Sequence, residues 1–273
     1  MPITEYLLPG PTVYPEGITL GPGGDFFVGS SADGTIFRGL LTEATTDVWL
    51  PAGSDDRTVA LGLTVYDDSQ LLVCGGKTGQ FHAYDVRTRE LVSRRAVDGY
   101  LNDVQVIGHH AYVTDSSRPT VWRFDLRAAD TPPEPLDLPR AGYLNGIAGR
   151  DDFLLVADQG DEVVWRLGLD GAAEVIATDY AADGLLLVDD VLIGVCNRGE
   201  TTQTAEFFLS ALRLSPAGPA VHLGEYADPR FATPTTLALD SDRLLVVNAQ
   251  FAARPDPKLP FSVIALAVPT DRR

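Results

Sequence analysis

Short apolar runs separated by polar turns recur along the whole chain, always in the same order. A strand-like run that begins at a small or polar residue is followed by a β-branched run and then by a run ending near a basic or aromatic residue. Their alternation with period two predicts strands, and no long amphipathic pattern predicts a helix. The three runs of successive units are 17–20, 26–29 and 34–38; 62–65, 71–74 and 79–84; 103–106, 111–114 and 120–124; 146–148, 154–157 and 163–167; 184–187, 191–194 and 208–212; 236–239, 244–247 and 261–266.

The spacing of these units predicts the fold class. The first runs begin at positions 17, 62, 103, 146, 184 and 236, so the repeats are 38 to 52 residues long. That is the length of one four-stranded propeller blade. We therefore predict an all-β, six-bladed β-propeller, with its blades around a central axis and a single domain over residues 1–273. Segment 4–8 is expected to supply the outer strand of the last blade and close the ring, which removes exposed sheet edges.

The charge and the apolar content of the chain limit the classes of partner that it is expected to bind. The chain has 21 Lys and Arg against 38 Asp and Glu, a formal net charge of -17. Such a surface repels nucleic acid and anionic lipid, so we expect a small-molecule partner, no nucleic acid and no membrane. The amino terminus lacks a signal-peptide pattern, and the expected location is cytoplasmic. Cys74 and Cys196 lie in apolar runs, which predicts buried free thiols. The sequence leaves the oligomeric state open.

The repeat also predicts a functional site. The first strand of each blade lies innermost in a propeller, so the residues just before the six repeat positions should form a ring at one mouth of the axis. These residues are Glu16, Leu61, Asn102, Asn145, Asp183 and Thr235. Four of them offer carboxylate or amide oxygens, the ligands of a hard divalent cation, and calcium is favoured over magnesium, manganese or zinc. The alternative is that the Asn-Gly, Asp-Gly and Asn-Asp pairs are simply turns.

The motifs around these positions resemble the gluconolactonase / regucalcin (senescence marker protein) family. The similarity rests on Tyr14-Pro15-Glu16-Gly17, Leu101-Asn102-Asp103, Leu144-Asn145-Gly146 and Ala182-Asp183-Gly184, and it covers nearly the whole chain. The resemblance implies that Glu16, Asn145 and Asp183 bind one divalent metal ion, that Asn102 completes the shell and contacts substrate, and that the reaction is lactone hydrolysis.

One position departs from the pattern of the sugar lactonases. Those enzymes often have Arg two residues before the Asn of the Asn-Asp pair, and this chain has Tyr100 there. Tyr14 and Tyr143 occupy the same offset in their own blades. Residues two apart in a strand face the same way, so the three tyrosines are expected to line the substrate pocket. An aromatic pocket favours a substrate other than a simple sugar lactone.

The loops after the second strands are expected to open on the same face and to add polar residues, Arg198 among them; these loops contain residues 30–31, Lys77, 116–118, Gln159, 197–198 and 248–250. The longest loop, 197–207, is expected to act as a lid.

The predicted chemistry follows from this shell. Asp183 and Asn102 are the expected catalytic residues. Asp183 is expected to act as the general base, or alternatively as a nucleophile, and Asn102 is expected to contact the substrate. The main hypothesis is a metal-dependent hydrolase of a lactone or related ester. A second hypothesis keeps the fold and the metal but changes the reaction to isomerisation, cyclisation or decarboxylation of a biosynthetic intermediate. A third hypothesis is a binding propeller without catalysis, although a scaffold needs none of the four polar ring residues.

Overall fold

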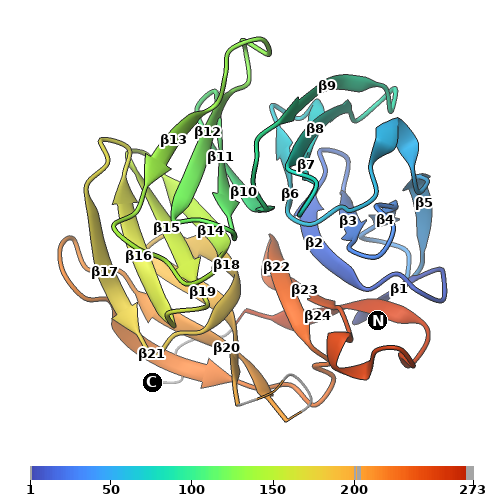
Figure 1. Cartoon of the computed structure of the whole chain (residues 1–273). Coiled ribbons are helices and arrows are strands. Elements are labelled where there is room, and N and C mark those ends of the chain that lie inside the picture. The colour runs from blue at the N-terminus through green and yellow to red at the C-terminus, as the bar shows by residue number, and fades with distance from the viewer. Residues whose placement is uncertain (1, 200, 202–203, 269–273) are drawn as a thin grey trace.

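The computed structural model describes residues 2–199, 201 and 204–268, and this part of the chain forms six four-stranded antiparallel sheets around a central axis (Figure 1). The predicted six-bladed β-propeller is confirmed. The strands, in blade order and from the axis outward, are β2 (Pro15–Leu20), β3 (Asp25–Ser30), β4 (Ile36–Leu40) and β5 (Thr46–Leu50); β6 (Leu63–Tyr66), β7 (Gln70–Cys74), β8 (Gln80–Asp85) and β9 (Leu91–Ala96); β10 (Leu101–Ile107), β11 (His110–Asp115), β12 (Thr120–Asp125) and β13 (Glu134–Asp137); β14 (Leu144–Arg150), β15 (Phe153–Asp158), β16 (Val163–Gly168) and β17 (Ala173–Thr178); β18 (Ala182–Val188), β19 (Val191–Arg198), β20 (Glu206–Arg213) and β21 (Val221–Tyr226); β22 (Pro234–Asp240), β23 (Arg243–Asn248), β24 (Phe261–Ala267) and β1 (Glu5–Leu8).

The amino-terminal strand closes the ring, as the sequence predicts. Strand β1 pairs antiparallel with β24, with Glu5 opposite Ile264 and Leu8 opposite Phe261. Tyr6 and Leu8 are fully buried and pack in the same apolar cluster as Phe261. The two ends of the chain's repeats therefore lie side by side, and β1 completes the last blade as its outer strand (Figure 1).

The core lies between the blades. Each of six apolar clusters combines side chains of two neighbouring blades, because a blade is covered by a neighbour on both faces. The second strands are apolar on both faces for the same reason, and residues 26–30 of β3 are all buried. Cys74 and Cys196 are buried free thiols, as predicted.

Helical structure is almost absent. Among the described residues only two 3-10 turns occur, η1 (Ser54–Asp56) and η2 (Phe251–Ala253). No helix in that part of the chain has the length and apolar character needed to cross a membrane.

The inner strands share a local irregularity that positions the axial residues. In five of the six inner strands the pairing register shifts around the predicted ring residue. The shift begins one residue before the ring residue and ends two residues after it, at Pro15/Ile18, Leu101/Val104, Leu144/Ile147, Ala182/Leu185 and Pro234/Leu237. A bulge of this kind bends a strand and redirects one side chain. The Asn-Gly and Asp-Gly pairs therefore lie in bulged strands, and the interpretation of these pairs as turns is wrong.

The glycines after the ring positions allow the inner strands to approach one another closely. A Cβ on Gly17 would lie 2.1 Å from the carbonyl oxygen of Leu61, and one on Gly146 would lie 2.3 Å from that of Asp183. Real Cβ atoms do not approach backbone so closely, so only glycine fits at these contacts. The preceding residue in each strand is then the one that projects towards the axis.

Candidate functional site

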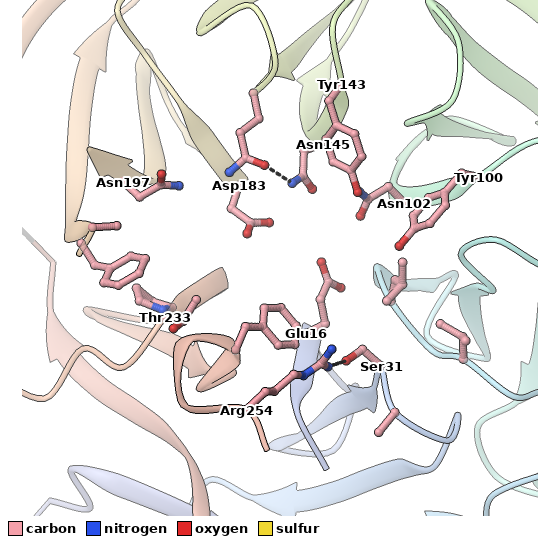
Figure 2. A pocket seen from close by; sticks show the side chains of 18 of the residues that line it. Glu16, Ser31, Tyr100, Asn102, Tyr143, Asn145, Asp183, Asn197, Thr233 and Arg254 are labelled. Atoms are coloured by element: carbon pink, nitrogen blue, oxygen red, sulfur yellow. Dashed lines mark hydrogen bonds between the residues drawn. The ribbon is translucent and has the colours of Figure 1, made fainter. Parts of the chain in front are cut away.

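A cavity of about 890 Å³ opens at one mouth of the axis, and the bulged residues form its floor (Figure 2). Five of the six predicted ring residues line it: Glu16, Leu61, Asn102, Asn145 and Asp183. Thr235 does not. Its hydroxyl is buried and donates a 2.8 Å hydrogen bond to the carbonyl oxygen of Glu16, while Thr233 and Pro234 take its place in the lining.

Each of the two asparagine side chains is held by a hydrogen bond to the residue that follows the second strand of its own blade. Asn102 Nδ2 donates to Ser116 Oγ at 2.9 Å, and Ser116 Oγ donates in turn to the carbonyl oxygen of Leu144 at 2.6 Å. Asn145 Nδ2 donates to Gln159 Oε1 at 3.1 Å (Figure 2). Fixing the amide nitrogens leaves the amide oxygens available at the floor of the cavity, and Asn102 Oδ1 is buried without any hydrogen-bond partner.

The carboxyl groups at the axis are crowded and lack a cationic partner among the described residues. Burial, then the charges of Asp183 and Asp103, raise the pKa of Glu16 well above its usual value. Burial, then the charge of Asp103, raises the pKa of Asp183 to about 8, although a hydrogen bond from Asn145 opposes the shift. Burial also raises the pKa of Asp103 to about 6, and this residue accepts hydrogen bonds from the backbone N–H groups of Val104 and Ile147.

These residues fit a hard divalent cation. Glu16 Oε2 is buried without a partner, like Asn102 Oδ1, and both belong to the predicted ring. A cation would supply the positive charge that the clustered carboxyl groups lack and a ligand bond for the two unpaired oxygens. No set of three or more His, Cys, Asp or Glu side chains within the described residues is arranged to hold a metal, so a site here depends on the amide oxygens of Asn102 and Asn145.

The walls of the cavity are partly aromatic, as the sequence indicates for two of the three tyrosines. Tyr100 and Tyr143 line the cavity with their ring centroids 6.3 Å apart. Burial raises the pKa of both phenols. Phe207 and Phe251 also line the cavity. Phe207 ends the segment that was expected to act as a lid, whereas Phe251 was not selected from the sequence.

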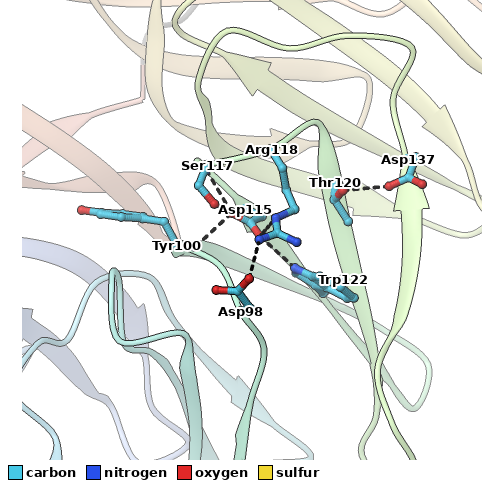
Figure 3. Close-up of polar contacts among 8 residues, drawn as sticks. All are labelled: Asp98, Tyr100, Asp115, Ser117, Arg118, Thr120, Trp122 and Asp137. Atoms are coloured by element: carbon cyan, nitrogen blue, oxygen red, sulfur yellow. Dashed lines mark hydrogen bonds and ion pairs between the residues drawn. The ribbon is translucent and has the colours of Figure 1, made fainter.

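A buried aspartate positions each of these tyrosines. Asp115 Oδ1 accepts the backbone N–H of Tyr100 at 3.0 Å, and Asp158 Oδ1 accepts that of Tyr143 at 2.9 Å. Asp115 is also held by Ser117, Trp122 and Arg118 (Figure 3). The segments that enter β10 and β14 are thereby tied to the ends of the neighbouring strands in the same way.

The structure does not bring the other two predicted substrate-binding residues to the cavity. Tyr14 has a φ of 43°, which breaks the strand alternation and turns its ring into the core, where it packs 5.0 Å from the Phe261 ring. Arg198 still belongs to β19, so alternation directs Asn197 to this cavity and Arg198 to a neighbouring one. Arg198 pairs there with Glu225 at 2.7 Å.

Ser116, Gln159 and Lys77 lie in loops that were expected to open at this mouth, and Lys77 and Gln159 line the cavity. The sequence did not reveal that Ser116 and Gln159 orient the asparagines. Ser116 and Gln159 each lie 14 positions after the asparagine that they orient, and this equal spacing in two blades is a signal the sequence does contain. Lys77 and Arg254 add two cationic side chains to the lining. They come from the loops between the second and third strands of two different blades. The segment after β19 was expected to form a lid over residues 197–207, and its positions 200, 202 and 203 lie outside the described residues.

The chain resembles known proteins in its structure and not in its sequence. No model of a known protein family matches the chain, and no curated protein matches its sequence. Virginiamycin B lyase from Staphylococcus aureus is 13% identical, with a TM-score of 0.68 over 97% of this chain and 98% of that one. A catalytically inactive histidine-to-alanine variant of that lyase, solved with quinupristin, gives a TM-score of 0.67 at 13% identity over 97% and 98% of the two chains. U3-55K is 11% identical, with a TM-score of 0.72 over 98% of this chain and all of that one.

Such identities are too low to carry activity from one propeller to another, because the same fold serves enzymes and scaffolds alike. The chain is a six-bladed β-propeller with an acidic, amide-lined cavity on its axis.

Proposed function

We propose that the protein is a divalent-metal-dependent hydrolase of a lactone or related ester, with a substrate other than a simple sugar lactone. One observation carries the proposal: two carboxylates and two oriented amides meet at the floor of the axial cavity, where Glu16 Oε2 and Asn102 Oδ1 are buried without partners. A binding scaffold has no use for such a costly arrangement.

Glu16, Asn102, Asn145 and Asp183 are the residues that would hold the cation. Their all-oxygen donor set favours calcium, and magnesium, manganese or zinc are the alternatives. When bound, the cation supplies a fixed positive charge that polarises an ester carbonyl and stabilises negative charge on its oxygen. Ser116 and Gln159 keep the amide oxygens of Asn102 and Asn145 directed to this point.

Asp183 is the general base of the proposed reaction. It projects from the bulge of β18 into the cavity, with a carboxyl group that burial makes more basic than usual. Asp183 takes a proton from the attacking water and returns it to the leaving alkoxide oxygen, so that one water and one lactone give one hydroxy acid. Direct attack by the Asp183 carboxylate is the alternative. In direct attack, Asp183 forms an anhydride with the acyl group and expels the alkoxide, and water then hydrolyses the anhydride at the Asp183 carbonyl. A single turnover in ¹⁸O-labelled water separates the two routes, because that hydrolysis leaves the label in Asp183 and gives unlabelled product.

The aromatic walls set the expected substrate class. Tyr100, Tyr143, Phe207 and Phe251 present apolar faces above the polar floor, and they favour an aryl or alkyl group over a bare sugar ring. We therefore expect hydrophobic lactones and esters to exceed gluconolactone in kcat/KM.

A non-hydrolytic reaction at the same site is the second candidate, and the likeness to a propeller lyase favours it. That lyase loses activity when one histidine is replaced by alanine. All four histidines of this chain are described, and none of them lines the axial cavity, which favours a carboxylate-based hydrolysis instead. Products formed in ¹⁸O-labelled water decide between the two, because hydrolysis incorporates one solvent oxygen, whereas isomerisation, cyclisation and elimination incorporate none.

The direct test is a panel of lactones and esters, run after chelation and after adding back each divalent metal. We expect metal-dependent turnover with calcium. Asp183→Asn should lower kcat far more than it lowers calcium occupancy measured by calorimetry, since the amide keeps an oxygen donor but removes the base. Turnover unaffected by chelation would refute the proposed function. Equal losses of kcat and occupancy would make Asp183 a ligand only.

A further inference from the structure

The wall of the axial cavity holds an arginine in an unusual setting. The guanidinium carbon of Arg254 lies 4.2 Å from the ring centroid of Tyr14 and 4.6 Å from that of Phe251. These two rings are themselves stacked, 6.4 Å apart and 25° from parallel. Arg254 and Phe251 line the cavity, and Tyr14 supports them from the core. The arginine is therefore held in place on the surface of the cavity before any ligand arrives.

This stacking fixes the guanidinium and leaves most of its donors unused. A cation over aromatic faces is attracted by their quadrupoles, and a planar guanidinium stacks without losing its N–H donors. The only side-chain hydrogen bond of Arg254 within the described residues is a long one, from Nη2 to Ser31 Oγ at 3.4 Å (Figure 2). Five N–H donors in a rigid fork match the two oxygens of a carboxylate.

The lack of an acidic partner for Arg254 is informative in this protein. The chain has 38 Asp and Glu against 21 Lys and Arg, and surface arginines such as Arg94, Arg140 and Arg198 each pair with a carboxylate. No ion pair joins Arg254 or Lys77 to any described acidic side chain. In a polyanionic protein, two unpaired cations in the wall of one cavity point to an anionic group on the ligand.

Arg254 and Tyr100 line different sides of the cavity, and the carboxyl groups of Glu16 and Asp183 lie at its floor (Figure 2). A substrate carboxylate at Arg254 and a reacting carbonyl at the floor would therefore occupy separate parts of one cavity.

We propose that Arg254 is a specificity-determining residue that binds a carboxylate on the substrate, which is thus an acid-bearing lactone or ester with a hydrophobic skeleton. This inference rests on the proposed function only for the identity of the reacting group, a lactone or ester. Lys77 adds a second positive charge to the lining of the cavity. The aromatic side chains of the lining would contact the carbon skeleton.

The test compares an aryl γ-lactone that carries a carboxylate with its neutral carboxamide. We expect the wild-type protein with calcium to prefer the carboxylate in kcat/KM by roughly 10- to 100-fold, the effect of a charge-assisted hydrogen-bonded pair. Arg254→Gln should remove this preference mainly through KM, and Arg254→Lys should retain part of it because the charge stays while the stacked fork is lost. Phe251→Leu should reduce the preference by loosening the guanidinium.

Arg94→Gln is the matched control. It removes the same charge from an exposed arginine on the outer strand β9, paired with Asp56, so it reports any general effect of net charge. Equal losses of preference in Arg94→Gln and Arg254→Gln would overturn the inference, because long-range attraction would then explain the effect. A preference that survives Arg254→Gln, or a wild-type preference for the neutral lactone, would also overturn it.

A binding measurement keeps the inference separate from the proposed hydrolase. If neither lactone is turned over, the proposed function fails, and calorimetry with 4-phenylbutyrate and its amide then tests Arg254 by itself. Tighter binding of the carboxylate that Arg254→Gln abolishes supports the anion site without the hydrolase. Equal affinity for acid and amide, or an acid affinity unchanged in Arg254→Gln, refutes the anion site whatever the protein catalyses.

Discussion

The acidic floor predicts a metal-free protein that loses stability as the pH rises. The pKa of Asp183 rises from its ordinary 3.8 to about 8 because of burial and then the charge of Asp103. The pKa of Glu16 is raised too, by burial and then by Asp183 and Asp103. A carboxyl group with a raised folded-state pKa stabilises the fold fully below its unfolded pKa, near 4. That contribution is lost as the pH rises through the folded-state pKa, near 8.

The size of this loss follows from the shift. One pKa unit corresponds to about 1.4 kcal/mol. Asp183 borders an open cavity, and solvent there reduces the cost of its charge, so we expect a loss of roughly 2–3 kcal/mol between pH 5 and pH 9. For a domain of this size that is a fall of about 5–10 °C in Tm. A divalent cation should reverse it, because the ion stabilises the ionised carboxylates that the protein alone cannot.

Thermal unfolding in chelator and in calcium, at pH values from 5 to 9, measures the effect. The calcium-induced rise in Tm should be small at pH 5, where protons compete for Asp183, and largest above pH 8. Asp183→Asn serves as the reference, because it keeps the shape and cannot ionise. Its metal-free Tm should depend less on pH and its response to calcium should be weaker. A calcium effect of equal size at pH 5 and pH 9 in the wild-type protein would refute the reasoning.

Three further substitutions test the construction of the site. Ser116→Ala removes the acceptor that orients the amide of Asn102, so calcium affinity should fall about tenfold while the fold persists. Tyr100→Arg restores the residue that sugar lactonases often have, and should narrow the preference for hydrophobic over sugar lactones in kcat/KM. Gly17→Ala places a Cβ 2.1 Å from the carbonyl oxygen of Leu61 and should lower the free energy of unfolding by about 1–3 kcal/mol in denaturant titrations.

Neighbouring positions provide the controls. Ser117→Ala removes a hydroxyl that donates to Asp115 rather than to the ring, and should leave calcium affinity unchanged. Gly23→Ala adds a Cβ whose nearest neighbour is 3.7 Å away, and should cost little stability. Calcium affinity equal in Ser116→Ala and the wild type would show that Asn102 needs no such support. If the preference for hydrophobic over sugar lactones is the same in Tyr100→Arg as in the wild type, this wall does not determine substrate selectivity.

The limits of the sequence prediction are clearest at Tyr14 and Arg198. Tyr14 has the same offset from its ring residue as Tyr100 and Tyr143, yet a positive φ turns it into the core. Arg198 follows Asn197 by one residue in β19, yet Asn197 lines the axial cavity and Arg198 lines only the neighbouring one. Offset in a repeat predicts which strand a residue belongs to, but one dihedral angle or one step of register decides which way it points.

The sequence by itself determined the blades, the closure by segment 4–8 and the floor of the cavity. These are local properties: alternation with period two defines strands, and the repeat places Glu16, Asn102, Asn145 and Asp183 at one point of their blades. Only the tertiary structure decided which residues form the walls of the cavity. Arg254 comes from the loop between β23 and β24, and it meets Tyr14, far away in the chain, because ring closure brings the first and last blades together. Contacts of that kind depend on long-range packing, and no local pattern encodes them.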